Sequence, residues 1–327
     1  MNKGYYISKN YIDKFTASSK AKLYVEKILK KNSFKNIGLP ALSIENKLIG
    51  RIYTVLSNIL AYFRMPKDKA VFIQYPVNFC EFQVKRAKQR NNKVIIQIHD
   101  INILRNTDFN SLQPLRDADT IIAHTESMKR WLIENDINSN VEVLGIFDYL
   151  DNSKVDIPDS DKYIIAFAGN LGKSKFLNYI TGNDFVSFRL FGIGGEKIKL
   201  NNGVEYCGCY SPEELAKHME AHFGLVWDGN TLDTCNGING EYLKFISPHK
   251  LSMYISAGLP VIVWEKSAMA DFVRKHNVGV IISSLNELYA ALESLSKEQY
   301  ERMKVATKEL AEKVEDGVFL SNILKKL

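Results

Sequence analysis

The sequence predicts an α/β protein made of two Rossmann-like, doubly wound domains that face each other across a cleft. Short runs rich in Val and Ile alternate with longer amphipathic segments, which is typical of parallel strands joined by helices. The chain has 327 residues, a length that suits two domains. Its 46% apolar and 24% charged residues exclude disordered, collagen-like and disulfide-rich chains.

The strands are expected in the apolar runs, which are short and bounded by polar or turn residues. They are expected at residues 70–74, 94–98, 120–123, 142–144, 163–168, 185–191, 224–227, 261–263 and 279–282. The segments between them favour helices, because apolar residues recur there every three or four positions. Helices are expected to include residues 19–31, 47–64, 79–91, 126–135, 212–221, 248–257 and 285–295.

The domain boundary is expected at residues 148–162, a polar stretch with almost no apolar periodicity. The charge changes sign near the same place: residues 1–155 hold 24 basic and 15 acidic residues, a net charge of +9, whereas residues 156–327 carry −3. We therefore expect one domain over residues 1–150 and a second over 151–317. The apolar-periodic segment 318–327 is expected to pack back on the first domain.

Composition and motifs also exclude several classes of function. The N-terminus has no apolar core of a secretory signal, no apolar run is long enough to span a membrane, and the four cysteines lack zinc-ligand spacing. We therefore expect a cytoplasmic protein. Dispersed basic residues argue against nucleic-acid binding. No metal site is expected, because the D-A-D of Asp117 and Asp119 directly precedes an apolar run and indicates a helix-to-strand junction.

The most informative segment is FISPHKLSMYISAGLPVIVWE at residues 245–265. Ser247 followed by Pro248 predicts an N-cap and a first helical residue, and the free N–H groups of such a helix end attract anions. His249 and Lys250 fall in the first turn, where a lysine opposes the helix dipole, so phosphate binding is one reason for its presence. The alternative is a well-capped crossover helix with a surface lysine.

Two further segments follow predicted strands. The turn GNLGKSK at 169–175 brings Gly169, Asn170 and Lys173 to a strand end, where backbone N–H groups and a lysine can bind a diphosphate; a tight turn with solvated lysines is the alternative. QIHD at 97–100 places His99 and Asp100 at another strand end. Either side chain suits a general base, although a structural polar pair has the same sequence.

The basic, apolar segment 47–67 has two interpretations. It suits a helix lying on an anionic membrane surface. It equally suits a helix whose apolar side packs on the sheet, and we favour this second interpretation.

Five motifs taken together resemble bacterial glycosyltransferases of the two-domain GT-B fold. The motifs are QIHD, the GN turn, CYSPEEL at 209–215, FGLVWDG at 223–229 and PHKLSMYISAGLPVIVWE at 248–265. The chain is similar to the glucosyltransferase-3-like group, which extends O-glycans on serine-rich-repeat adhesins, and to related galactofuranosyltransferases. The similarity spans nearly the whole chain and is greatest in the second half.

The resemblance implies a role for particular residues. Lys250 would contact the nucleotide diphosphate, Tyr210 would hold the nucleotide, and Lys173 is the nearest equivalent of a basic residue in a G-N-P-x-R turn. Glu265 would hydrogen-bond the ribose or sugar hydroxyls. The remaining nucleotide-sugar contacts are expected at Gly169, Asn170, Ser247 and His249, and the acceptor base at Asp100 or His99.

The implied function is transfer of glucose, galactose or galactofuranose from a UDP-sugar to a glycan, glycoprotein or lipid-linked acceptor. No cofactor or metal is expected, because lysines and backbone N–H groups can stabilise the leaving diphosphate. A UDP-sugar epimerase and a non-catalytic partner subunit of the same fold are the alternatives. The first domain is expected on the acceptor side, with a homo-oligomer and a peripheral membrane contact as further expectations.

Overall fold

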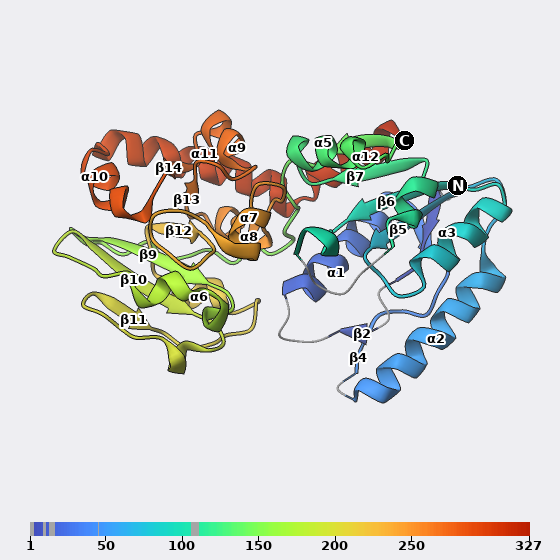
Figure 1. Cartoon of the computed structure of the whole chain (residues 1–327), viewed down its shortest axis with the longest axis horizontal. Coiled ribbons are helices and arrows are strands. Elements are labelled where there is room, and N and C mark those ends of the chain that lie inside the picture. The colour runs from blue at the N-terminus through green and yellow to red at the C-terminus, as the bar shows by residue number, and fades with distance from the viewer. Residues whose placement is uncertain (1–2, 9–10, 13–16, 45, 106–110) are drawn as a thin grey trace. The chain divides into compact units, whose positions relative to one another are not determined.

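The computed structural model describes residues 3–8, 11–12, 17–44, 46–105 and 111–327 (Figure 1). The chain divides into two compact units: an N-terminal unit of residues 1–148 and 317–327, and a C-terminal unit of residues 149–316. Each unit contains a six-stranded sheet in which every strand pair is parallel. The α/β, doubly wound class predicted from the alternating pattern is therefore confirmed.

The sheet of the N-terminal unit has the order β3-β1-β5-β6-β7-β8. Its strands are β1 (Gly4–Tyr6), β3 (Phe34–Asn36), β5 (Ala70–Tyr75), β6 (Lys93–Ile98), β7 (Thr120–Ala123) and β8 (Asn140–Val143), and β2 (Tyr11–Ile12) pairs with β4 (Leu42–Ser43) separately. The helices are α1 (Ala17–Lys31), α2 (Lys47–Arg64), α3 (Cys80–Gln89), α4 (Gln113–Asp117), α5 (Glu126–Glu134) and α12 (Val318–Lys326), with a 3₁₀ turn at Asn102–Arg105.

The sheet of the C-terminal unit has the order β11-β10-β9-β12-β13-β14. Its strands are β9 (Tyr163–Ala168), β10 (Val186–Phe191), β11 (Val204–Tyr206), β12 (Phe223–Val226), β13 (Val261–Trp264) and β14 (Gly279–Ile282). The helices are α6 (Leu215–Met219), α7 (Gly237–Tyr242), α8 (His249–Ser256), α9 (Ala270–His276), α10 (Leu288–Glu293) and α11 (Lys297–Glu315). Because the strand order reverses between β9 and β12, the switch point where doubly wound sheets bind ligands lies there.

All the strands expected from the apolar runs form, with ends that differ from the expected ones by at most two residues. β1, β3 and β11 were not predicted, because each has only three residues and lacks the longer apolar run that indicates a strand. The helix expected at 212–221 is confined to Leu215–Met219, and the one expected at 285–295 opens with a 3₁₀ turn. The D-A-D segment is the helix-to-strand junction that was expected, since α4 ends at Asp117 and β7 starts at Thr120.

The favoured interpretation of α2 is wrong, because the helix does not pack its large apolar side chains on the sheet. Its buried residues are small or polar: Gly50, Thr54, Ser57, Asn58 and Ala61. The large apolar side chains lie on the opposite, exposed side. No helix in the described part of the chain is both long and apolar enough to cross a membrane.

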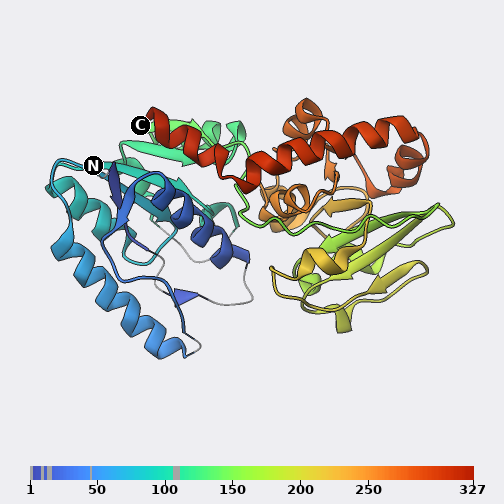
Figure 2. The same ribbon diagram turned by 180° about the vertical axis from the view of Figure 1, so that it is seen from behind.

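The C-terminal helix α12 belongs to the N-terminal unit, although α11, which precedes it, belongs to the other (Figure 2). The buried carboxylate of Asp148 accepts hydrogen bonds from the backbone N–H groups of Phe319 (3.0 Å) and Leu320 (2.8 Å) in the first turn of α12. Asn32 donates to the Ser321 hydroxyl at 2.9 Å. Asp148 thus caps α12 from a position 171 residues earlier in the sequence.

Burial raises the pKa of Asp148 from 3.8 to about 7, against the opposing effect of the Leu320 and Phe319 N–H groups. A carboxyl group whose pKa is higher in the folded than in the unfolded chain contributes its full stabilisation at pH values below the unfolded-state pKa. This contribution decreases as the pH rises and is lost once the pH passes the folded-state pKa of about 7. We expect the free energy of unfolding to fall between pH 4 and 7 by at most about 1.4 kcal/mol per pH unit through this group.

Urea unfolding of Asp148→Asn at a series of pH values measures this effect, because the amide keeps an acceptor oxygen but does not titrate. The exposed Asp156→Asn is the control and should follow the wild type. Parallel pH profiles for Asp148→Asn and the wild type would show that Asp148 carries no such pH dependence.

Candidate functional site

Three loops lie side by side at the carboxyl edge of the C-terminal sheet. They follow β9, β10 and β11 at residues 169–173, 192–195 and 207–210. Backbone hydrogen bonds join the first loop to the last residue of β10, from Gly169 N–H to Phe191 O (3.0 Å), and to the second loop, from Leu171 N–H to Ile193 O (2.9 Å). A third bond, from Gly192 N–H to Gly208 O at 2.9 Å, joins the second loop to the third. The loops therefore form one continuous layer.

Glycine is required where the first two loops meet. A Cβ atom on Gly192 would lie 1.9 Å from the carbonyl oxygen of Gly169, and one on Gly194 would lie 2.8 Å from the nitrogen of Gly172. Both Gly192 (φ 131°) and Gly194 (φ 88°) also adopt positive φ, which side chains disfavour. The predicted residues Gly169, Asn170 and Lys173 remain exposed on the outer side of this layer.

Lys250 reaches the same edge from α8. Its ammonium donates to the carbonyl oxygen of Trp227 at 3.4 Å, lies 3.9 Å from an Asp228 carboxylate oxygen, and sits 4.4 Å from the centroid of the Phe167 ring. A Cβ on Gly169 would be 3.9 Å from the same ammonium. Phe167 belongs to β9 and Asp228 follows β12, so the ammonium lies at the switch point of the sheet.

The charge of Lys250 is only loosely satisfied by the protein. An ammonium carries three N–H donors, and among the described residues its one hydrogen-bond acceptor, the Trp227 carbonyl, is at a long distance. The Lys250 side chain is 19% exposed, which is open enough for a ligand to reach it.

Burial raises the pKa of the nearby Cys235 thiol to about 12, which keeps that thiol protonated and unreactive.

The predicted N-cap of α8 is wrong by one residue. The cap position is Pro248, and no side chain there accepts a hydrogen bond from the first turn. Ser247 precedes the cap residue and is buried, so its hydroxyl does not occupy the capping position that the sequence predicted. His249 and Lys250 are then the first two helical residues, and Lys250 lies in the first turn as predicted.

Tyr254, four residues after Lys250, fixes α8 against the sheet. The backbone N–H of Ala168, the last residue of β9, donates to the Tyr254 hydroxyl at 2.7 Å. The ring covers Gly224 in β12, where a Cβ would lie 2.2 Å from the ring carbon. Burial raises the pKa of Tyr254, so the phenol stays neutral. One side chain thus holds both the helix that carries Lys250 and the strand that leads into the loop at residues 169–173, called the Gly169 loop below.

Two other predicted residues flank this centre. Tyr210 ends the third loop, partly exposed, and its ring stacks on His218 with centroids 3.9 Å apart. Glu265 is exposed and directly follows β13, whose last paired residue with β12 is Val263, opposite Val226. One edge of the C-terminal sheet therefore carries these predicted residues in the spatial order of its strands: Tyr210, the Gly169 loop, Lys250 and Glu265.

His99 and Asp100 lie in the N-terminal unit, directly after β6. His99 is only 5% exposed, its Nε2 is 2.8 Å from the Gln74 carbonyl oxygen, and its ring stacks on Phe147. Asp100 is more accessible, with 32% of its side chain exposed and Arg105 at 3.2 Å. The dipeptide therefore contains one buried and one accessible group.

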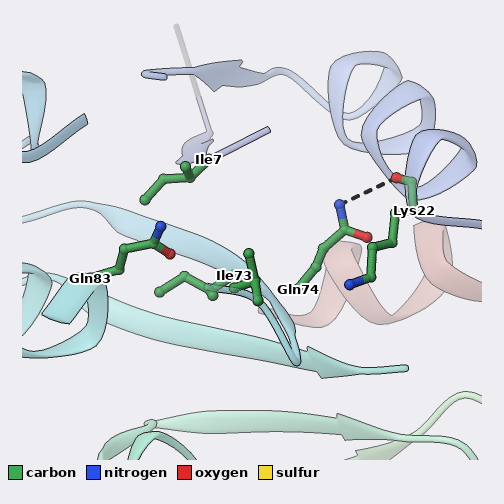
Figure 3. A pocket seen from close by; sticks show the side chains of 6 residues that line it. Ile7, Lys22, Ile73, Gln74 and Gln83 are labelled. Atoms are coloured by element: carbon green, nitrogen blue, oxygen red, sulfur yellow. Dashed lines mark hydrogen bonds between the residues drawn. The ribbon is translucent and has the colours of Figure 1, made fainter. Parts of the chain in front are cut away.

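Figure 3 shows a hollow at the carboxyl edge of the N-terminal sheet, between β1 and β5, where the strand order of that sheet reverses. The Gln74 amide donates to the backbone carbonyl of Lys22 at 3.2 Å, which turns its own carbonyl oxygen toward His99. The hollow encloses about 20 Å³, room for about one water molecule. It is lined by Ile7, Lys22, Ile73, Gln74, Val77 and Gln83.

Sequence reasoning missed Asp228 and Tyr254. Asp228 is part of the FGLVWDG motif, but nothing in that motif marks it as a partner of Lys250. The contact between the two side chains follows only from the order of the strands in the sheet. Tyr254 had a detectable signal, because it is one helical turn from Lys250 and a glycine interrupts the strand that it covers.

Comparison with known proteins places this geometry in a family. A model described as the glucosyltransferase 3-like N-terminal domain matches residues 4–146, and the corresponding C-terminal model matches residues 165–327. The chain belongs to the glucosyltransferase 3-like family. The glycosyltransferase class and the GT-B fold predicted from the sequence are confirmed.

Relatives in this family are similar along most of their length. The β-1,6-galactofuranosyltransferase WbbI of Escherichia coli K12 is 33% identical over 72% of this chain and 71% of its own. Glucosyltransferase 3 of Streptococcus gordonii is 26% identical over 74% of this chain and 72% of its own.

Solved structures share the glucosyltransferase 3-like fold at low sequence identity. Sucrose-phosphate synthase of Thermosynechococcus elongatus aligns with a TM-score of 0.64 and 12% identity, covering 100% of this chain and 97% of its own. HepE of Anabaena, solved in complex with UDP-glucose, gives 0.62 and 11%, covering 98% of both chains. These two likenesses support the fold of the chain.

Tyr254→Phe should loosen the edge without removing any charge. The variant leaves the buried Ala168 N–H without its acceptor, which costs about 1–3 kcal/mol of unfolding free energy. Hydrogen exchange should accelerate at Ala168 and through residues 169–173. The matched control is Tyr300→Phe, which removes another buried tyrosine hydroxyl, one that bonds to the His222 carbonyl at 3.2 Å. Equal exchange in the two variants would show that Tyr254 does not position the loop.

Proposed function

We propose that this chain transfers a hexose from a UDP-sugar to a glycan, glycoprotein or lipid-linked acceptor. The observation that carries the proposal is the Lys250 ammonium at the switch point of the C-terminal sheet, loosely held by the protein and beside the Gly169 loop. A nucleoside diphosphate supplies the anionic oxygens that such an ammonium lacks.

In the proposed donor complex, the diphosphate lies over the Gly169 loop and the first turn of α8. Lys250 binds its oxygens and stabilises the charge that develops on the leaving UDP. Lys173, exposed at the end of the same loop, adds a second cation. Transfer then proceeds without a metal ion, with Asn170, Ser247 and His249 completing the diphosphate surroundings through backbone or side-chain contacts.

The remaining edge residues are proposed to hold the rest of the donor. The partly exposed ring of Tyr210 provides a flat surface for the nucleotide base, because its other face is already supported by His218. Glu265 accepts hydrogen bonds from ribose or sugar hydroxyls. The names of WbbI and glucosyltransferase 3 support galactofuranose and glucose as the transferred sugars, and galactose remains a third candidate.

We propose Asp100 as the base that deprotonates the acceptor hydroxyl in an inverting transfer. Its carboxylate is accessible, and Arg105 at 3.2 Å orients it. His99 is buried against Gln74 and Phe147, so its role is to position the strand end and Asp100 rather than to meet the acceptor. The alternatives of an epimerase and a non-catalytic subunit gain no support from a specific contact.

Lys250→Ala should lower the affinity for UDP about ten- to a hundredfold, because one charge-assisted contact to the diphosphate is lost. Calorimetry with UDP measures this loss. In a thermal-shift series with UDP, UDP-glucose, UDP-galactose and UDP-galactofuranose, the wild type should respond to UDP and to its own donor, and the variant should need about ten- to a hundredfold more of each ligand for the same shift.

Two further variants separate a ligand-binding lysine from a structural ion pair. Asp228→Asn removes the carboxylate charge beside the ammonium and should preserve or improve UDP binding, whereas Lys308→Ala removes an exposed lysine of α11 and should change nothing. Unaltered UDP affinity in Lys250→Ala, or an equal loss in Asp228→Asn, would contradict the diphosphate assignment.

Asp100→Asn should reduce kcat about 10²- to 10⁴-fold, the usual contribution of a general base, while UDP binding is retained. Initial rates with the donor found above and a glycan acceptor measure the effect. Asp117→Asn, an exposed carboxylate in the same unit, is the control. A kcat within a few-fold of the wild type would exclude Asp100 as the base.

A further inference from the structure

The outer side of α2 is a continuous apolar surface. Its large side chains are between 43% and 76% exposed, and they recur every third or fourth position so that they share one side of the helix. These residues are Leu48, Ile49, Ile52, Val55, Leu56, Ile59 and Phe63. An exposed apolar surface of this extent on a folded domain marks an interaction site.

The inner side of α2 is already fixed to the N-terminal unit, so the helix cannot simply turn over to bury its apolar side. The Ser57 hydroxyl accepts the Leu39 N–H at 2.9 Å, and the Asn58 side chain receives a hydrogen bond from Gln83 of α3. Ser57 and Asn58 are buried, with at most 4% of their surface exposed. Turning the helix would expose these satisfied groups and break their bonds.

Charge on α2 has one sign. The helix holds Lys47, Arg51 and Arg64, all exposed, and contains no acidic residue. At 100° per residue, Arg51 and Arg64 fall on opposite flanks of the apolar stripe rather than within it. Apolar side chains between flanking cations are the arrangement of a helix that lies in the plane of an anionic bilayer, with the cations at the level of the headgroups.

We propose that α2 docks this chain on a membrane surface containing anionic lipid. A second copy of the chain is a poorer occupant, because pairing two α2 helices through their apolar sides brings their cations together without an acidic partner on either helix. An anionic headgroup layer supplies the complementary charge. This inference uses no residue of the donor site and rests on the proposed function only in placing the transferase beside lipid-linked acceptors.

Co-sedimentation with vesicles tests the proposal. Vesicles of phosphatidylcholine and phosphatidylglycerol should bind the wild-type protein, with binding that weakens as salt is raised, whereas pure phosphatidylcholine should bind it far less. Replacing Ile52, Leu56 and Phe63 together by Gln should weaken binding roughly tenfold for each side chain. Arg51→Gln and Arg64→Gln should each weaken it about fivefold.

Matched controls carry the same chemistry elsewhere. Gln in place of Ile133, Ile238 and Val305 removes three exposed apolar side chains from other helices, and Arg274→Gln with Arg302→Gln removes two exposed arginines of the C-terminal unit. These variants should bind vesicles as the wild type does. Since all the substituted side chains are exposed, thermal unfolding should remain close to that of the wild type.

Three results would overturn the proposal: no binding of the wild type to anionic vesicles, equal binding by the α2 triple variant, or an oligomer in solution that the triple variant dissociates. The last result would assign the surface to a second copy. UDP affinity, measured on the same samples, should be unchanged by the triple variant. Absence of UDP binding in the wild type would instead contradict the proposed function and leave the membrane surface untouched.

Discussion

The C-terminal unit depends on the contact between Tyr254 and the two central strands of its sheet. The ring requires Gly224 to have no side chain, and the hydroxyl requires a free N–H at the end of β9. This contact brings the N-terminus of α8 to the switch point between β9 and β12. Lys250, in the first turn of α8, therefore lies beside the Gly169 loop in the folded chain, and no loop has to move to bring the two together. Placing the cation on rigid elements makes its position precise and costs little ordering on binding.

The fold was accessible from the sequence because buried parallel strands have continuous Val- and Ile-rich runs, and such runs are readily recognised. The same reasoning fails for β1, β3 and β11, where three residues per strand leave the periodicity too short to detect. At the carboxyl edge of the C-terminal sheet, the positions of Gly169 and Glu265 directly after strands were predictable, since parallel strands bring their carboxyl ends to one edge. The contact of Lys250 with Asp228 was not, because it depends on the crossover that places β12 beside β9.

Helix α2 shows a different limit. Periodicity identified an amphipathic helix with the correct bounds, but periodicity alone does not tell which side faces the protein. Gly50, Thr54 and Ser57 decide the question, because small residues allow close approach and the hydroxyls find backbone partners. A stripe of small polar residues opposite a stripe of large apolar ones is thus a signal for a helix whose apolar side is reserved for another surface. Cap positions are limited in another way: Ser247 and Pro248 both suit a helix start, and only the backbone geometry distinguishes them.

The two kinds of anion recognition considered for this chain use charge differently. Residues 1–148, which belong to the N-terminal unit, supply the whole +9 charge of residues 1–155, and α2 contributes three cations without an acid. A flat anionic surface is recognised by the sum of many weak, salt-sensitive attractions, so net charge and its distribution matter. A diphosphate is recognised by a few short contacts in a partly buried site, so one well-placed lysine is effective even though residues 156–327 carry a net charge of −3. The division of charge along the chain therefore follows from the geometry of what each unit is proposed to bind.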